Sequence, residues 1–311
     1  MKNLFDYINE SLLDDEDILI GNTKDDAYAR ALIEKIKQGV ALNKDEVKWC
    51  DTHTAVIRVT KEELENIILL IYWNNKDISL NWLDVSQITD MSDVFRYSLF
   101  DGDISKWDVS NVTNMGSMFF MSKYTGKNGD ISKWNVSNVT NMGSMFSSSK
   151  YNGDLSKWKT SNVKWMGSMF YSSSFDGKNG DISKWDVRKV IDMSNMFRST
   201  DFNQDLNKWD VSNVESMGGM FEESNFDGDI SEWNVEKLKY AYEMFGGNTV
   251  FNCDISNWKL INLDNADYMF SGSKFNRDLK RWSMFLPKSF NMRKMFLNSK
   301  VDKENRPKIK R

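Results

Sequence analysis

Residues 103–115 read DISKWDVSNVTNM, and residues 130–142 repeat this string with a single substitution, as DISKWNVSNVTNM. A fixed period of 20 to 50 residues is typical of proteins built from structural repeats. Tryptophan recurs every 24 or 25 residues from Trp82 to Trp282, except at two intervals of 27 residues, where a surface turn carries three extra residues. The sequence therefore predicts nine units of about 24 residues, each marked by one tryptophan: Trp82, Trp107, Trp134, Trp158, Trp185, Trp209, Trp233, Trp258 and Trp282.

The apolar positions within one unit mix two periods. The step of two from Trp107 to Val109 predicts a strand, and the steps of three that end in Met115, Met118 and Phe119 predict a tight helical turn. One unit cannot bury its apolar side alone, so the units must stack. The expected fold is an α/β solenoid of about nine 24–27-residue units over residues 76–299, each a short parallel strand plus a helical turn.

Methionine is unusually abundant, and its positions indicate its role. Fifteen of the 18 methionines occupy the two paired apolar positions of the unit, such as Met115 with Met118. Because methionine packs adaptably in interiors, these side chains are expected in the core; an exposed sulfur-rich strip is the alternative.

An α-helical cap is expected over residues 25–75. Thr23 can cap a first helix that ends at Gly39, and Thr60 with Glu63 forms the capping box of a second. Such a cap would close the first end of the stack.

The two ends of the chain carry opposite charge. Residues 1–24 are acidic and are expected to be flexible, and residues 300–311 form a basic tail. Both are expected to be solvated, although the tail could also serve as an electrostatic arm for an acidic partner.

Composition narrows the function. With 41 basic and 45 acidic residues and a net charge of −4, the chain has no basic field for nucleic acid, and no apolar run reaches the ~18 residues of a membrane span. His53 is the single histidine, and Cys50 and Cys253 are expected to be reduced thiols, so no enzyme, cofactor or structural metal is expected. No secretory signal or lipid-attachment cysteine is found near the start, which favours a cytoplasmic or virion-associated protein over a secreted one.

An aspartate precedes each Ile-Ser-Lys-Trp string or its variants. These carboxylates are expected to accept backbone N–H groups in their own turns. The alternative is weak calcium binding, at Asp101, Asp103, Asp227 and Asp229.

The polar positions that follow each tryptophan form the candidate binding face. They vary little, so they suit a repetitive ligand such as a glycan, a polymer or a neighbouring copy better than one unique protein epitope; a merely solvated face is the alternative. Arg188, Lys189, Glu236 and Lys237 are its most individual residues. The full candidate set is Asp108, Ser110, Asn135, Lys159, Asp186, Arg188, Lys189, Asp210, Glu236 and Lys237. The ligand and the oligomeric state are left open.

The string at 103–115 and its copies resemble the repeat of BspA-like leucine-rich repeat surface proteins, also described as the DUF285 repeat of mycoplasma lipoproteins, over about Asp77 to Phe296. The resemblance implies that an L-x-x-L-x-L strand falls on Ile104, Trp107 and Val109, in a non-catalytic solenoid that adheres to proteins, matrix or cells. Val112 replaces the asparagine that usually follows, so the usual horseshoe curvature is not expected. A surface location does not carry over without an export signal.

Residues 5–17 are similar to short leader segments on virion or cargo proteins of tailed phages of gut bacteria. This similarity implies a second function, that of a structural or virion-associated protein whose solenoid is a rigid scaffold docked through its N-terminal segment. A non-enzymatic binding or adhesion module is the first expectation.

Overall fold

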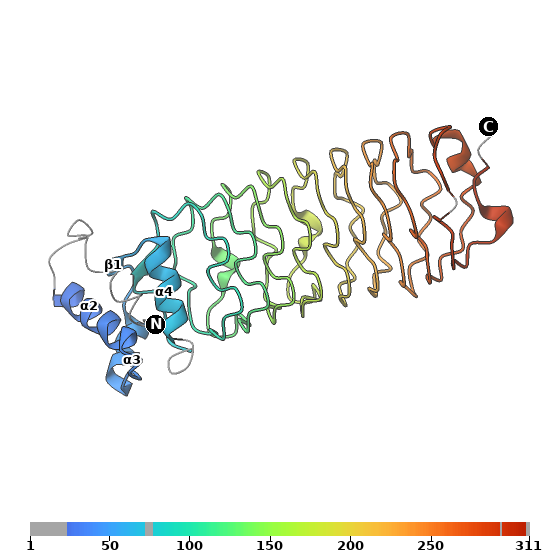
Figure 1. Cartoon of the computed structure of the whole chain (residues 1–311). Helices are drawn as coiled ribbons and strands as arrows, with labels where there is room; N and C mark the ends of the chain where they lie inside the picture. Colours follow the sequence, from blue (N-terminus) through green and yellow to red (C-terminus); the bar gives the residue numbers. More distant parts are fainter. Residues whose placement is uncertain (1–23, 72–76, 293, 309–311) are drawn as a thin grey trace, which may run out of the picture.

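The computed structural model describes residues 24–71, 77–292 and 294–308. The helices α2 (Lys24–Lys37), α3 (Lys44–Thr52) and α4 (Lys61–Ile71) form one end, and successive coils of chain follow one another to the other end (Figure 1). Over these residues, no helix has the length and apolar character needed to cross a membrane. The leader-like residues 5–17 and the predicted cap at Thr23 lie outside the described residues.

Hydrogen bonds at the helix ends explain where the cap helices start and stop. At the start of α4 the predicted capping box is confirmed, because the Thr60 N–H donates to the Glu63 carboxylate and the Glu63 N–H donates to Thr60 Oγ1. Gly39 follows α2 with a φ of 69°, as a helix-ending glycine does. The helix α3 was not predicted, although Asn43 and Glu46 form the same kind of capping box.

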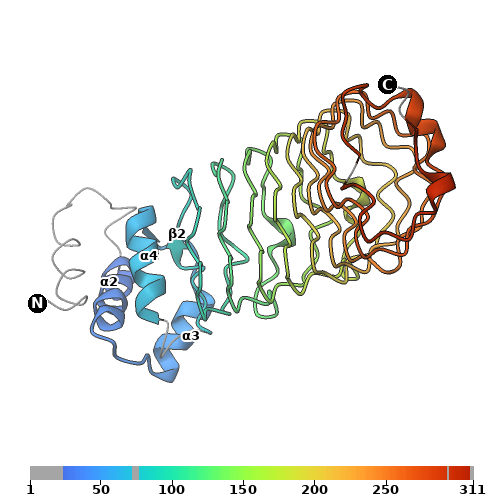
Figure 2. The ribbon, with the colours of Figure 1, turned by 45° about the vertical axis from the view of Figure 1, so that its right-hand side comes forward.

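The cap continues directly into the first unit. Strand β1 (Ile57–Arg58) pairs in parallel with β2 (Leu83–Asp84), and Arg58 Nε lies 3.2 Å from Asp84 Oδ2. The helix α4 lies beside the first coils in both views (Figures 1 and 2) and buries Leu64, Ile67, Ile68 and Ile71. The apolar edge of the first unit is therefore covered.

Parallel bridges join consecutive units at one position per unit: Asp90, Asn114, Asn141, Trp165, Asp192, Ser216, Tyr240 and Asn265. We call the eight residues that start at each of these positions the ladder segment, for example 114–121. Alternate N–H groups of this segment donate to the next unit, as Met115 does to the Asn141 carbonyl (2.9 Å) and Ser117 to the Gly143 carbonyl (2.8 Å). Main-chain hydrogen bonds between ladder segments therefore link the units.

Trp107–Val109 is not a strand, although the equivalent residues of the first unit form β2 (Leu83–Asp84), directly after Trp82. The Trp107 N–H donates to the Ile104 carbonyl and the Val112 N–H donates to the Val109 carbonyl. These backbone groups therefore form two turns within one unit and do not pair with a neighbouring unit as a strand would. The side chains still alternate into the core, which is why the pattern resembled a strand.

The helical turn predicted at Met115–Phe119 is also wrong. Ser117 has a φ of 55°, in the left-handed region, where a right-handed helix cannot continue. The 3₁₀ segments of the repeats instead precede the tryptophan, at η1 (Ile131–Lys133) and η2 (Ile182–Lys184).

Like residues stack in the core. The indole N–H of Trp107 donates to the Leu80 carbonyl of the preceding unit (2.8 Å), and the same bond recurs up to Trp282 and Ile255 (3.0 Å). A phenylalanine column from Phe95 to Phe296 stacks with ring centroids 5.1–6.0 Å apart. The predicted burial of the paired methionines is confirmed at each of them from Met91 to Met269.

The C-terminal segment packs on the last unit. The Leu279 N–H donates to the Asn305 carbonyl (2.8 Å), and Val301 and Pro307 are buried between η3 (Lys280–Met284), η4 (Lys303–Asn305) and the chain end. Residues 300–308 are therefore held against the last unit, while most of their charged side chains remain exposed, as expected from their charge.

Candidate binding surfaces

The predicted binding residues lie along one edge of the stack, where each unit turns after its tryptophan. Asp108, Asn135, Asp186 and Asp210 each accept the backbone N–H two residues ahead, which holds the turn. Lys159 stands at the corresponding position, but its side chain has no atom that could accept this hydrogen bond. We call this row the Asx edge. Its acceptor side chains act mainly as turn-forming groups, and its role in binding remains a prediction.

Three cations of the Asx edge, Arg188, Lys189 and Lys237, also have partners, whereas Lys159 has none among the described residues. Arg188 makes a bidentate contact with Asp186 (2.9 and 2.7 Å), and this hydrogen bond holds the pKa of the Asp186 carboxyl below its usual value. Lys189 Nζ donates to Asn162 Oδ1 (2.7 Å), and Glu236 accepts from Lys259 (2.9 Å).

Asparagines form a ladder along the same edge. Asn111 Nδ2 donates to the Ser86 carbonyl of the preceding unit (2.8 Å). The same bond is made by Asn138, Asn162, Asn213 and Asn262. Val112 is buried at the position where an asparagine usually stands, and this ladder lies one residue earlier, at the exposed Asn111.

The aspartates before Ile-Ser-Lys-Trp are turn-forming groups. From Asp103 to Asp278, each accepts the N–H two residues ahead at 2.7–3.0 Å. Asp101 binds the N–H and hydroxyl of Thr125, and Asp227 accepts from the Asn252 N–H. Within the described ranges, no three His, Cys, Asp or Glu residues gather as metal ligands would. The calcium alternative at Asp101, Asp103, Asp227 and Asp229 has no such cluster to support it.

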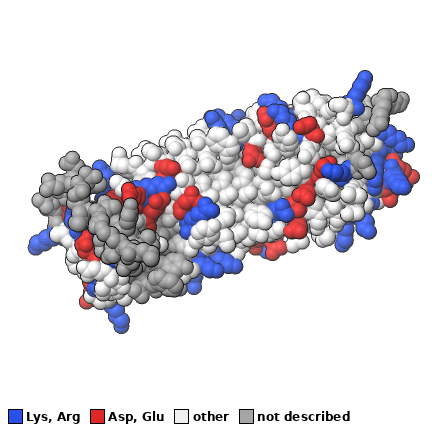
Figure 3. All heavy atoms as spheres, in the orientation of Figure 1, with Lys and Arg blue, Asp and Glu red and all other residues white. Residues whose placement is uncertain are grey.

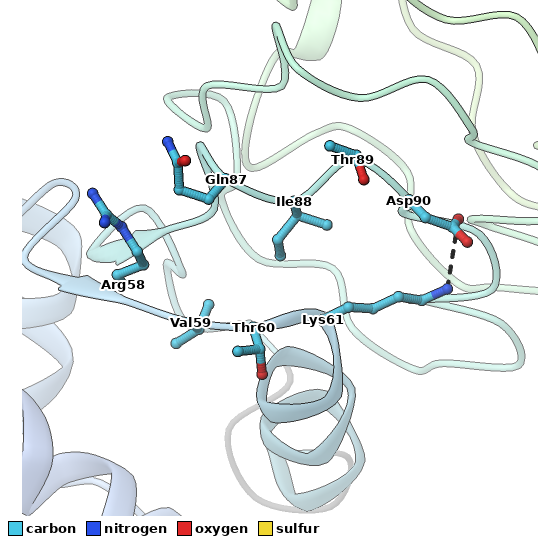
Figure 4. Close-up of a pocket in the computed structure, with 8 residues that line it drawn as sticks. All are labelled: Arg58, Val59, Thr60, Lys61, Gln87, Ile88, Thr89 and Asp90. Atoms are coloured by element: carbon cyan, nitrogen blue, oxygen red, sulfur yellow. Dashed lines mark ion pairs between the residues drawn. The ribbon is translucent and has the colours of Figure 1, made fainter. Parts of the chain in front are cut away.

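A groove of about 410 Å³ lies where the cap meets the first unit (Figure 4). Its cations already have partners, because Lys61 Nζ lies 3.6 Å from Asp90 Oδ1 and Arg58 pairs with Asp84. The groove therefore offers little free charge to an anionic ligand.

The ladder segments show a different surface. Those at 114–121, 141–148 and 165–172 contain no charged residue, whereas the segments on either side contain Asp93 and Arg96, or Asp192 and Arg198. We call the exposed and half-buried side chains of these three segments the uncharged patch. One side of the body likewise has a largely uncharged middle with charged side chains gathered toward both ends (Figure 3).

Large side chains are exposed on this patch. Met121 is 49% exposed and Trp165 is 42% exposed, while Phe120 and Tyr171 are half-buried. Cations lie at its margins, with Arg96 4.8 Å from the Phe120 ring centroid, Lys164 5.9 Å from that of Trp165, and Arg198 5.8 Å from that of Tyr171.

The patch also carries unused hydroxyl groups. Ser117, Ser144 and Ser168 share one register position, and among the described residues their hydroxyls have no hydrogen-bond partner. This distinguishes the patch from the Asx edge, where the polar groups hold turns. Its hydroxyls are free for a ligand.

The two thiols and the histidine are at least half-buried. Burial raises the pKa of the Cys50 thiol to about 12 and that of Cys253 to about 11, so both are protonated at neutral pH. His53 stacks on Trp49 in the cap, at a centroid distance of 4.1 Å.

One carboxyl group beyond the uncharged patch is unusual. Glu222 is buried, and this burial raises its pKa to about 7 against the opposing charge of Arg198, whose Nη1 lies 2.9 Å away. Glu243 and Glu223 raise the pKa further.

Glu222 is expected to make stability depend on pH. Because its folded-state pKa lies above the unfolded value near 4.5, the free energy of unfolding should fall as pH rises from about 4.5 to 7, by on the order of 2 kcal/mol. Urea unfolding of Glu222→Gln should show less of this fall than the wild type. Glu232→Gln is the control, because Glu232 is exposed and is not among the charges that shift the pKa of Glu222. Identical pH profiles for Glu222→Gln and the wild type would contradict the assignment.

The parallel ladder and the stacked columns define a protein of stacked repeats. Residues 70–179, 174–225 and 200–308 match the family described as Mycoplasma protein of unknown function, DUF285, and the chain belongs to this family. No curated protein and no solved structure matches the chain.

Sequence reasoning missed the uncharged patch. Trp165 lies outside the tryptophan period, Met121 lies outside the paired methionine positions, and three consecutive ladder segments lack charge. These departures from the repeat were the available signal. The predicted face instead followed the strand assigned to Trp107–Val109.

Proposed function

We propose that this chain is a non-enzymatic binding module that contacts a protein or polymeric ligand through the uncharged patch. The observation that carries the proposal is the exposure of Met121 and Trp165 on a surface without charge, over a core that is fully packed. Aromatic residues and methionine are enriched where proteins bind partners, and charged residues are depleted there. The likeness to BspA-like leucine-rich repeat surface proteins supports an adhesive role, and we extend it to this chain as part of the proposal.

A rigid scaffold is the second candidate function. It is favoured by the stack itself, since the cap extends the first unit and residues 300–308 pack on the last one. Recovery of the protein in purified virus particles would favour the scaffold, and recovery on the cell envelope would favour adhesion.

The patch can be tested by placing charge on it. Ser144→Glu with Ser168→Glu should be tolerated, because Asp93 and Glu243 occupy the same register position with φ of 64° and 53°. On an array of purified polysaccharides and proteins, this variant should bind at least about tenfold more weakly than the wild type, since carboxylates would lose water at the interface.

The Asx edge provides the matched comparison. Arg188→Glu with Lys189→Glu should bind as the wild type does if the patch is the site. Loss of binding in that variant alone would place the site on the Asx edge, as the sequence predicted, and failure of the wild type to bind any array member would contradict a binding function.

A further inference from the structure

We infer that the uncharged patch binds a neutral polysaccharide chain, an inference that rests on the proposed function and specifies its ligand. The first reason is charge. Acidic polymers, nucleic acids and anionic membranes are bound through Lys and Arg, and the ladder segments at 114–121, 141–148 and 165–172 contain none. At the margin, Arg198 is paired with Glu222 at 2.9 Å and Arg96 with Asp93 at 2.8 Å, whereas Lys164 makes no ion pair among the described residues.

Exposed aromatic surface is the second reason. Arg96 lies over the Phe120 ring and Arg198 over the Tyr171 ring, at 4.8 and 5.8 Å, so Trp165 offers the more accessible ring of the patch. A sugar ring has an apolar C–H face that packs on an aromatic ring, and Trp165, 42% exposed, offers the largest such surface here.

The hydroxyl groups are the third reason. Ser117, Ser144 and Ser168 present one hydroxyl per unit with no partner among the described residues. A row of donors and acceptors at the repeat of the stack suits a ligand that is itself a repeating polyol. Small numbers of well-placed polar groups beside apolar surface are the usual means of fixing such a ligand.

The backbone argues against a peptide added as a strand. Alternate N–H groups of the ladder, such as those of Met115, Ser117 and Phe119, already donate to the next unit, and the carbonyls of Asn114, Gly116 and Met118 accept from the preceding one. Strand addition needs a free edge, and these segments have none.

The test is direct binding of cellohexaose, chitohexaose and maltohexaose by calorimetry, with heparin and gelatin as the acidic and protein comparators. We expect at least one neutral hexasaccharide to bind with an affinity that does not change between low and high salt, because no ion pair forms. Trp165→Ala should weaken that binding by about tenfold. Tyr240→Ala is the matched control, since Tyr240 is 41% exposed at the same register position outside the patch.

Three outcomes would overturn the inference: no neutral hexasaccharide binds at millimolar concentration, binding is confined to heparin or gelatin, or Tyr240→Ala weakens binding as much as Trp165→Ala. If gelatin or heparin bound and the Ser144→Glu, Ser168→Glu variant lost that binding, the assignment of a neutral glycan as the ligand would be overturned. The proposed binding function of the patch would still stand. Unchanged thermal unfolding of Trp165→Ala would confirm that a loss of affinity is not a loss of fold.

Discussion

Deletion of residues 210–233 is expected to leave the protein folded, whereas deletion of residues 210–221 should interrupt the stack and lower the melting temperature far more. The first deletion removes one period and joins Trp209 to Asn234 and Val235, which stand where Asp210 and Val211 stood. In a stack where each unit contacts its neighbours, loss of one whole unit removes one set of contacts and preserves the rest.

The shorter deletion removes half a period and joins Trp209 to Glu222. The twelve residues that remain are too few to complete one unit, so the units on either side could not stack on each other and their facing phenylalanines and methionines would be exposed. Circular dichroism and thermal unfolding compare the two variants. A half-unit variant as stable as the whole-unit variant would contradict the stacked arrangement.

Phe197→Ala is expected to lower the free energy of unfolding by about 3–5 kcal/mol. The Phe197 ring is fully buried and stacks on Phe170, Phe202 and Phe221, at centroid distances of 5.7, 4.0 and 6.0 Å. Truncation leaves a cavity between two units and breaks the column where neighbours on both sides depend on it. Urea unfolding measures the loss.

Tyr240→Ala is the control for the column, because its ring is 41% exposed. A surface truncation of this kind should cost about 0.5 kcal/mol or less. If Phe197→Ala cost no more than Tyr240→Ala, the phenylalanine column would not be the core.

The side-chain pattern of the repeat could be predicted because buried positions are occupied by apolar residues, which can be recognised in the sequence. Trp107, Met115, Met118 and Phe119 recur at fixed spacing, and each lies in the core. The Thr60 capping box was equally visible, since the residues that cap a helix are few. Both are short-range or periodic signals.

The hydrogen-bonded register could not be predicted in the same way, because it depends on backbone angles. Ser117 and Met121 adopt positive φ, at 55° and 53°, although neither residue type favours it. Gly219 and Gly247 stand at the corresponding positions of later units, also with positive φ. Comparing the units column by column would have indicated left-handed positions, and with them the ladder segment.

The candidate site depended on that register. The Asx edge was identified from polar residues, yet polarity there serves the turns, as Asp108 and Asn111 show. The uncharged patch is marked by an absence of charge and by Met121 and Trp165, which depart from the repeat. In a protein of stacked repeats, residues that break the pattern on the surface point to function more clearly than those that follow it.

Hydroxyl-radical footprinting, with and without the bound hexasaccharide, tests whether the ligand lies on the uncharged patch. Trp165 and Met121 are exposed while the methionines and tryptophans of the core columns are buried, and Met284, 76% exposed far from the patch, is an internal reference. We expect the ligand to slow oxidation of Trp165 and Met121 and to leave Met284 unchanged. Equal oxidation of Trp165 and Met121 with and without ligand, under conditions where the ligand is bound, would contradict this expectation.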